Sequence, residues 1–529
     1  MRYKLLALVF MSLCSSVVTA QKHSVIPILD GEKWYGAITA FGSRAPFTKD
    51  IPKQSLSTDN YNNQTSPFMV SSAGRYIYSD MPFDFEFKGG NIIIDSPSEE
   101  VVPTAGGKTL KEAFLAARNA HFKGSGTIPD KIFFEKAQYN TWIELMYNQN
   151  QKDIEAYADA IIANKFSPGI LMIDDNWQRY YGNFDFRAEK FSDPKAMIKK
   201  LHDQGFKVML WVCPFVSSDS EEFRNLEKKG YLIKEKGSNN AAIIRWWNGY
   251  SACYDLTNPA AFDSLVQTLK GVQEKYGVDG FKFDAGDPTF YNPLVQDYYD
   301  KNAVSNDHTM KWSELGLYFP YNEYRATWKM QGEALVQRLG DKDKSWNALN
   351  LLIPEMLNAG LIGYSYTCPD MIGGGQFSSY LNIDQTKIDQ ELIVRSAQVH
   401  AFMPMMQFSV APWRILDDEH LKCCHIAAEL HENLKHYIIE MANHSASTGE
   451  PIVRSMEYQF PGEGFSECMD QFMLGDKYLV APILSKGGRR TVALPAGKWE
   501  DDMGVTYKGG KSVEIEASID RIPYFQKRK

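Results

Sequence analysis

Acidic side chains follow apolar, strand-like runs at several places in the chain. They are Asp174 and Asp175 after residues 169–173, Asp284 after residues 280–283, and Asp370 shortly after residues 361–366. A single Asp in such a place is commonly the N-cap of the next helix, but three such ends favour a shared site. Hydrolysis of a glycosidic bond requires several carboxyl groups, because it uses a nucleophile, a proton donor and further acids that hold hydroxyls. This pattern therefore favours a site that cleaves sugars.

The segment 280–287 (GFKFDAGD) carries the sharpest of these signals. In a strand, Lys282 and Asp284 point to the same face, because side chains alternate. A nearby ammonium group would keep the Asp284 carboxyl ionised, as a nucleophile requires. The alternative is a structural ion pair inside the fold, and the residues alone leave both interpretations open.

Strand-like and helical segments alternate between residues 131 and 445. The runs 141–146, 169–173, 207–212, 280–283 and 361–366 are predicted strands, and residues 259–276 carry apolar side chains at helical spacing. Alternation over about 300 residues predicts an α/β fold with a parallel sheet, most economically a (β/α)8 TIM barrel. In such a barrel, active sites lie at the carboxyl ends of the strands, where the acids above would meet.

Two regions on either side of the barrel are predicted to be rich in strands. Residues 21–130 contain turn-forming residues and strand-like runs at 83–87 and 91–94, which predict an N-terminal β-sandwich-like domain. Residues 446–529 contain short strand-like runs at 477–484, 490–494 and 511–515, which predict a C-terminal β-sandwich.

Composition and charge narrow the class of protein. The chain has 529 residues with 57 Lys and Arg against 65 Asp and Glu, a net charge of −8, and no long basic run, which argues against nucleic-acid binding. Residues 1–20 have a basic start, a short apolar run and small residues at 18–20, as a signal peptide does. No later segment is apolar enough to predict a membrane span. We expect an exported protein, periplasmic or secreted.

Several motifs together make the chain resemble glycoside hydrolase family 31. They are SSAGRY at 71–76, QYNTW at 138–142, DQFM at 470–473 and LVAP at 479–482. Within the family, the chain is most similar to the branch that holds the myogenesis-regulating glycosidase and certain bacterial α-galactosidases. The resemblance implies a (β/α)8 barrel and retaining hydrolysis of α-glycosides.

The resemblance also implies roles for individual residues. Asp284 matches the catalytic nucleophile. Asp341, at the end of RLGD (338–341) and five residues before Trp346, matches the general acid/base, although the family usually has Trp where Arg338 stands. Arg325 matches an arginine that binds the sugar and the catalytic carboxylates. Asp370 is the other candidate for the acid/base, but it matches a sugar-binding Asp that precedes a Gly pair.

Further residues are expected to line the sugar pocket. Asp174 or Asp175 matches an Asp that holds a distal hydroxyl, and Trp247 matches a pocket Trp. Three other indoles lie in or just after predicted strands: Trp142, Trp177 and Trp211. Each could line the pocket or pack in the barrel core, and the sequence leaves both interpretations open.

Two departures from the family pattern bear on the substrate. Lys282 replaces the Trp that α-glucosidases of the family carry two residues before the nucleophile, and a cation there can donate to an axial O4, as in galactose. Residues 407–409 (QFS) stand where those enzymes have a late His.

The sequence thus predicts an exported retaining exo-α-glycosidase, most simply an α-galactosidase, that acts on α-linked oligosaccharides or glycosides. No cofactor and no metal is expected, because carboxyl groups supply both the acid and the nucleophile. An α-glucosidase or α-xylosidase of the same family and a non-catalytic carbohydrate-binding protein are the alternatives. The oligomeric state stays open.

Overall fold

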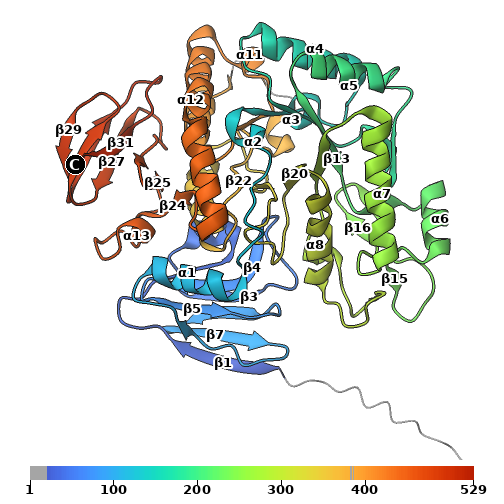
Figure 1. Cartoon of the computed structure of the whole chain (residues 1–529), viewed down its shortest axis with the longest axis horizontal. Coiled ribbons are helices and arrows are strands. Elements are labelled where there is room, and N and C mark those ends of the chain that lie inside the picture. Colours follow the sequence, from blue (N-terminus) through green and yellow to red (C-terminus); the bar gives the residue numbers. More distant parts are fainter. Residues whose placement is uncertain (1–20, 382–383, 385–386, 529) are drawn as a thin grey trace, which may run out of the picture.

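The computed structural model describes residues 21–381, 384 and 387–528. The predicted signal peptide at residues 1–20 lies outside the described residues. Three parts are visible in Figure 1: N-terminal strands in blue, a central barrel with helices around it, and C-terminal strands in red beyond the long helix α12 (Asp418–Thr448).

The N-terminal part consists of two four-stranded antiparallel sheets. The first has the order β1 (Lys22–Pro27), β7 (Asn91–Ser96), β6 (Asp84–Lys88) and β3 (Ile51–Ser55), and the second β2 (Trp34–Ile38), β4 (Thr65–Ser71), β5 (Arg75–Tyr78) and β8 (Thr104–Ala105). Alternating residues of β6 and β7 point inward, and they share one apolar core with Trp34 of the other sheet. Both strands predicted at 83–87 and 91–94 are therefore confirmed.

The central part is a nearly closed barrel of eight parallel strands, as predicted. In sheet order the strands are β22 (Thr367–Cys368), β21 (Gln337–Arg338), β20 (Tyr321–Tyr324), β18 (Gly280–Phe283), β13 (Lys207–Val212), β10 (Ile170–Ile173), β9 (Gln138–Asn140) and β23 (Gln407–Phe408). The backbone N–H of Ile372, just past β22, donates to the carbonyl of Gln407 at 2.8 Å and joins the two edges.

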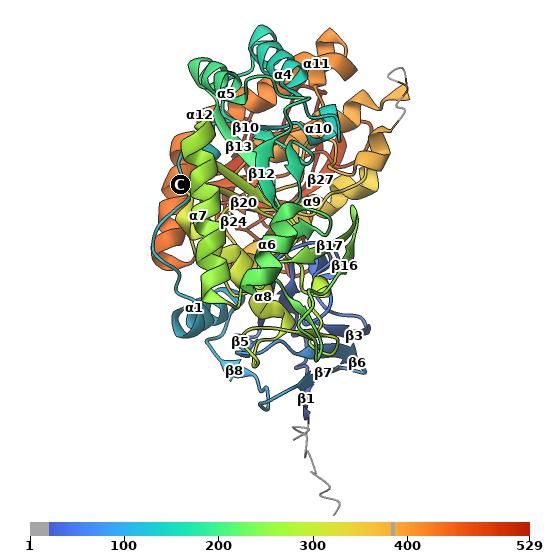
Figure 2. The same ribbon diagram turned by 90° about the vertical axis from the view of Figure 1, so that its right-hand side faces the viewer.

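Helices surround this barrel. They are α4 (Gln151–Ala163), α5 (Pro194–Asp203), α7 (Pro259–Tyr276), α8 (Ser305–Glu314), α9 (Trp346–Leu361), α10 (Gln390–Ala401) and α12. Helix α7 has the predicted bounds, because Asn258 caps its first turn, Pro259 occupies its first position and Gly277 ends it with φ +83°. In the turned view of Figure 2, α7 and the shorter α6 (Glu221–Lys229) lie on the side that faces the viewer.

Two predicted barrel strands are wrong. Residues 142–145 form the short helix α3 (Trp142–Leu145), and the barrel strand is the preceding β9. Residues 361–366 begin with the end of α9, and strand β22 starts only at Thr367. Both runs are apolar and short, and a buried helical end cannot be distinguished from a buried strand by periodicity alone.

Insertions after β13 and β18 add small sheets beside the barrel. β14 (Phe215–Ser217), β17 (Gly249–Cys253) and β16 (Ile244–Trp246) form one, and β15 (Lys234–Glu235) pairs with β19 (Gln296–Asp297). A further antiparallel pair, β11 (Gln178–Tyr180) and β12 (Asn183–Phe186), follows β10.

The C-terminal part is a β-sheet domain. Its six-stranded sheet has the order β24 (Val453–Arg454), β25 (Phe472–Leu474), β26 (Tyr478–Val480), β31 (Tyr524–Arg528), β28 (Lys498–Asp501) and β29 (Thr506–Lys508), and β27 (Arg489–Leu494) pairs with β30 (Lys511–Glu516). The two sheets share a core that includes Val492, Trp499 and Phe525. The strands predicted at 490–494 and 511–515 are confirmed, and the one predicted at 477–484 is shorter than expected.

Two further observations concern the whole described part. Across residues 21–381, 384 and 387–528, no helix has the length and hydropathy needed to cross a membrane. The six cysteines in this part are free thiols, and all but Cys468 are buried.

Candidate active site

A cavity of about 410 Å³ opens at the carboxyl ends of the barrel strands. This volume lies within the range of small-molecule sites, about 300–1,000 Å³. Every predicted site residue except Trp177 and Asp370 lines it: Trp142, Asp174, Asp175, Trp211, Trp247, Lys282, Asp284, Arg325 and Asp341. The structure therefore brings together side chains from six barrel strands or the loops that follow them.

Asp284, directly after β18, is held by donors on several sides. The indole N–H of Trp211 donates to its Oδ2 at 2.8 Å, the Nε of Arg325 lies 3.2 Å from its Oδ1, and the backbone N–H of Ala285 donates to Oδ1 at 2.8 Å. Burial acts to raise the pKa of Asp284, but Arg325 above all, then Lys282 and the Trp211 hydrogen bond, lower it to about 2. This carboxylate is therefore ionised at neutral pH and available as a nucleophile.

The main partner of Lys282 is Asp174, and not Asp284. Its Nζ lies 2.6 Å from Oδ2 of Asp174, and both side chains are buried. The alternative considered for Lys282, an ion pair inside the barrel, is thus present, and its effect on Asp284 acts through the charge alone. An ammonium group has three N–H donors, so Lys282 retains donors for a ligand in the cavity that it lines.

Asp175 is the second acid of the adjacent pair, and its partners come from the insertions. The amide of Asn248 donates to its Oδ2 at 2.7 Å, and the hydroxyl of Tyr181 donates to its Oδ1 at 3.2 Å. Burial, and next the charge of Asp174, raise the pKa of Asp175 to about 7. The sequence offered no sign of Asn248 or Tyr181, because both lie in loops outside the barrel strands.

Asp341 lies in the loop after β21 and lines the same cavity as Asp284. Its side chain is 33% exposed, and its Oδ1 accepts a hydrogen bond at 2.9 Å from Nη1 of Arg338. Arg325, whose guanidinium also pairs with the buried Asp287, lines the same cavity. A carboxyl group that is open to the cavity on one side can exchange a proton with a ligand.

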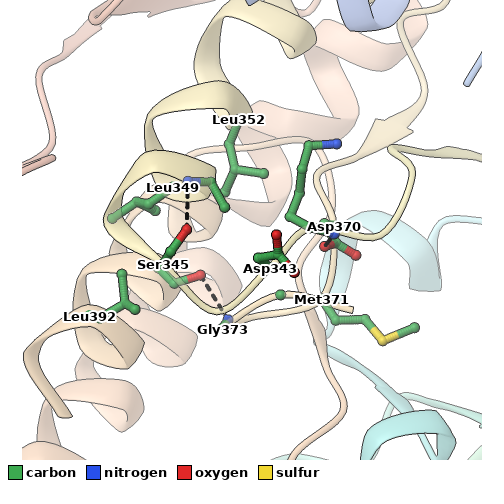
Figure 3. Close-up of a pocket in the computed structure, with 12 residues that line it drawn as sticks. Asp343, Ser345, Leu349, Leu352, Asp370, Met371, Gly373 and Leu392 are labelled. Atoms are coloured by element: carbon green, nitrogen blue, oxygen red, sulfur yellow. Dashed lines mark hydrogen bonds between the residues drawn. The ribbon is translucent and has the colours of Figure 1, made fainter. Parts of the chain in front are cut away.

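Asp370 does not line the cavity, contrary to the predicted sugar-binding position. Its Oδ1 accepts from Arg338 Nη1 at 3.0 Å, and its Oδ2 accepts from the backbone N–H groups of Lys342 and Gly375 at 2.6 and 2.8 Å. Figure 3 shows Asp370 instead at a separate small cavity of about 10 Å³, opposite Leu349 and Leu352 of α9. Its oxygens are occupied by protein donors, so its role in this structure is to hold the loops on either side.

The four indoles divide between wall and core. Trp177 is completely buried and donates through Nε1 to the backbone carbonyl of Trp211 at 2.7 Å, so its predicted pocket position is wrong. Trp247 is 46% exposed, and the Arg325 guanidinium lies 5.0 Å from its ring centre. Trp142 packs edge-on against Tyr147 and Phe377, which also line the cavity, with centroids 5.3 and 5.6 Å away.

Five lining residues were not predicted as site residues: Asn62, Tyr147, Arg338, Gln376 and Phe377. Asn62 comes from the N-terminal part, where the neighbouring Gln64 donates to the backbone carbonyls of Arg325 and Arg338 at 2.8 and 2.9 Å. These partners are more than 260 residues apart in the chain, so local sequence patterns carry no signal for them.

The position expected for a late His is occupied by Gln407, inside the barrel. Its amide donates to the buried Glu323 at 2.7 Å, and it does not line the cavity. Within the described ranges, no three His, Cys, Asp or Glu side chains are grouped as metal ligands would be.

Comparisons with known proteins identify the family of the chain. The profile of the glycosyl hydrolases family 31 TIM-barrel domain matches residues 133–438, and that of the family's C-terminal domain matches residues 449–529. The chain is 32% identical over 418 residues to the myogenesis-regulating glycosidase of Mus musculus, covering 77% of this chain and 58% of that protein. It is 24% identical to an α-xylosidase of Emericella nidulans, covering 93% and 66% of the two chains.

A solved structure has the same fold. The GH31 dextranase of Flavobacterium johnsoniae, in complex with glucose, superimposes with a TM-score of 0.83 at 22% identity, covering 96% of this chain and 66% of that one. The chain thus spans less than two thirds of the length of each of these proteins.

Proposed function

Because the chain belongs to glycoside hydrolase family 31, we propose that it is a retaining exo-α-glycosidase, and specifically an α-galactosidase. The observation that carries this proposal is the contrast between two acids of one cavity. Asp284 is kept ionised by Arg325, Lys282 and Trp211, while Asp341 is partly exposed in the same cavity. A nucleophile and a proton donor are what a retaining mechanism requires.

The proposed reaction has two steps. In the first, Asp341 gives its proton to the glycosidic oxygen while Asp284 attacks the anomeric carbon, so that the bond to the leaving group breaks and a glycosyl-enzyme ester forms. In the second, the Asp341 carboxylate takes a proton from water, which attacks the same carbon and releases Asp284. Arg325, bound to Asp284 and Asp287, orients the nucleophile in both steps.

The preference for galactose depends on Lys282. Its ammonium group is fixed by Asp174 within the cavity and retains donors that can reach an axial O4. The indole expected at this place in α-glucosidases would crowd that hydroxyl. The myogenesis-regulating glycosidase, at 32% identity, supports the same branch of the family.

Two other functions remain as alternatives. An α-xylosidase is among the similar proteins, and the same acids would cleave α-xylosides or α-glucosides if Lys282 contacts another hydroxyl. A non-catalytic carbohydrate-binding protein would use the same cavity, but it would have no need for an ionised Asp284 opposite Asp341.

Hydrolysis of 4-nitrophenyl α-galactoside and α-glucoside tests the proposal. We expect the galactoside to be preferred, Asp284→Ala to abolish activity, and proton NMR to show α-galactose as the first product. Asp343→Ala is the matched control, because Asp343 lies in the loop of Asp341 but contacts the hydroxyl of Ser379. Preference for the glucoside would discard the interpretation of Lys282, and inactivity on all α-glycosides would favour the binding protein.

We also propose that the protein is exported after removal of residues 1–20, to the periplasm or the medium. The basic start and short apolar run of this segment support the proposal. N-terminal sequencing of the protein from the periplasmic and medium fractions should give Gln21 as the first residue, and a protein that retains Met1 in the cytoplasmic fraction would contradict it.

A further inference from the structure

Arg338 is a buried cation that is shared by three acids. Its side chain is 2% exposed, and its Nη1 donates both to Asp341 at 2.9 Å and to Asp370 at 3.0 Å. Its Nε lies 3.4 Å from Oε1 of Glu323 on the neighbouring strand β20. One guanidinium therefore joins the proposed acid/base to two carboxyl groups that lie behind the cavity wall.

The two acids on Nη1 are also close to each other. A Cβ atom placed on Gly375 would lie 2.6 Å from Oδ1 of Asp370 and 2.9 Å from Oδ1 of Asp341. Both oxygens thus converge on one point beside the Gly375 backbone. Two carboxylates at such close range repel each other, and a cation between them relieves the repulsion.

The other charged side chains near Asp341 pair with groups other than Asp341. Arg325 and Asp284 line the same cavity as Asp341, and they pair with each other. The neighbouring Lys342 turns its ammonium group to Glu355 on α9, at 2.8 Å, and to the carbonyl of Gly340. Arg338 is therefore the cation that donates a hydrogen bond to Asp341.

We propose that Arg338 is a positioning residue that controls when Asp341 carries a proton. A cation bonded to a carboxyl group favours its ionised form, so Arg338 assists the step in which Asp341 removes a proton from water. The same contact opposes the step in which Asp341 must arrive protonated. Asp370 moderates this effect, because it accepts from the same nitrogen, Nη1, and repels the ionised Asp341. This inference rests on the proposed hydrolysis.

The consequence depends on the leaving group. A sugar alcohol leaves only with a proton from Asp341, so its cleavage falls when the pH rises and Asp341 loses that proton. Nitrophenolate leaves without a proton. The basic limb of kcat/KM for an α-linked disaccharide therefore reports the protonation that Arg338 and Asp370 control, and the nitrophenyl glycoside of the same sugar is the internal control.

The test uses two substitutions with opposite expected signs. Arg338→Gln removes the cation, and we expect the basic limb for the disaccharide to move to higher pH by about 1–3 units. Asp370→Asn removes the competing negative charge, and we expect the limb to move to lower pH. Arg338→Lys keeps a cation, so its limb should stay near that of the wild type even if kcat falls because the fork geometry is lost.

Loss of structure alone would not give opposite shifts. If both substitutions move the limb in one direction, or if neither moves it, Arg338 is only a structural cation. Thermal melting checks that each variant folds, and if Arg338→Gln does not, an unmoved limb in Asp370→Asn overturns the proposal by itself. A wild type that cleaves no α-glycoside would instead overturn the proposed function, which is a distinguishable result.

Discussion

Replacing Lys282 by Met should change both the stability of the barrel interior and the preference between substrates. The Lys282 and Asp174 side chains are 4% and 3% exposed, and their charges are 2.6 Å apart. Removing one partner of such a pair leaves a buried, unpaired charge and costs about 3–5 kcal/mol of stability. The double variant Lys282→Met/Asp174→Asn removes both charges, so it should be more stable than Lys282→Met alone.

The effect of Lys282→Met on substrate preference can be estimated separately from its effect on stability. If Lys282 donates to the axial O4, its loss removes a charged hydrogen bond worth about 1.5–3 kcal/mol. The ratio of kcat/KM for 4-nitrophenyl α-galactoside to that for the α-glucoside should then fall by about 10- to 150-fold. Steady-state kinetics on both substrates measures the ratio, and thermal melting measures the stability.

Lys342→Met is the matched control. Lys342 forms a comparable ion pair with Glu355, with side chains 11% and 5% exposed, but it does not line the large cavity. We expect it to lower the melting temperature and to leave the galactoside-to-glucoside ratio unchanged. An unchanged ratio in Lys282→Met, or an equal fall of the ratio in the control, would refute the assignment of Lys282 to O4.

Three further predictions follow from individual contacts. Trp211→Phe removes a hydrogen bond to the ionised Asp284, so the pKa of Asp284 should rise from about 2 by about 1–2 units. The acid limb of kcat/KM should then move to higher pH, and an unmoved limb would contradict the prediction. The pKa of Asp175 is raised from 3.8 to about 7, so its contribution to stability is present below pH 4 and is lost as the pH rises through 7. The melting temperature of Asp175→Asn relative to that of the wild type should therefore increase between pH 4 and pH 8. A constant difference would count against the raised pKa. Gln64→Ala removes two hydrogen bonds to backbone carbonyls behind the cavity and should cost about 1–3 kcal/mol, seen as lower kcat and melting temperature; full activity and stability would show that the N-terminal part does not support the site.

The sequence predicts an element well where neighbouring residues mark both its apolar pattern and its two ends. Strand 207–212 and helix 259–276 were predicted with their observed bounds, because an apolar run or a helical stripe ends at a cap or a turn. Residues 141–146 and 361–366 were mistaken for strands, because their apolar character reflects burial beside the barrel and not extended backbone.

The candidate site shows the same division. Acids and indoles at strand ends were found from the sequence, since the barrel fixes where strands end. Asp370 and Trp177 were placed on the wrong side of the wall, because sequence position does not tell which face of a loop or turn is buried. The contributions of Asn62 and Gln64 depend on contacts between distant parts of the chain, and only the structure shows them.

The pairing of cations with acids explains how one cavity can keep several carboxyl groups in different states. Lys282 is bound to Asp174, Arg325 to Asp284 and Asp287, and Arg338 to Asp341, Asp370 and Glu323. Asp284 is kept ionised by Arg325 above all, and then by Lys282 and the indole N–H of Trp211, which suits an acid that must act as a nucleophile. Of the three acids around Arg338, Asp341 is the one that is partly exposed to the cavity, which suits an acid that must exchange a proton with a ligand. The distribution of the cations therefore supports the proposed roles of Asp284 and Asp341 beside the motifs that first suggested them.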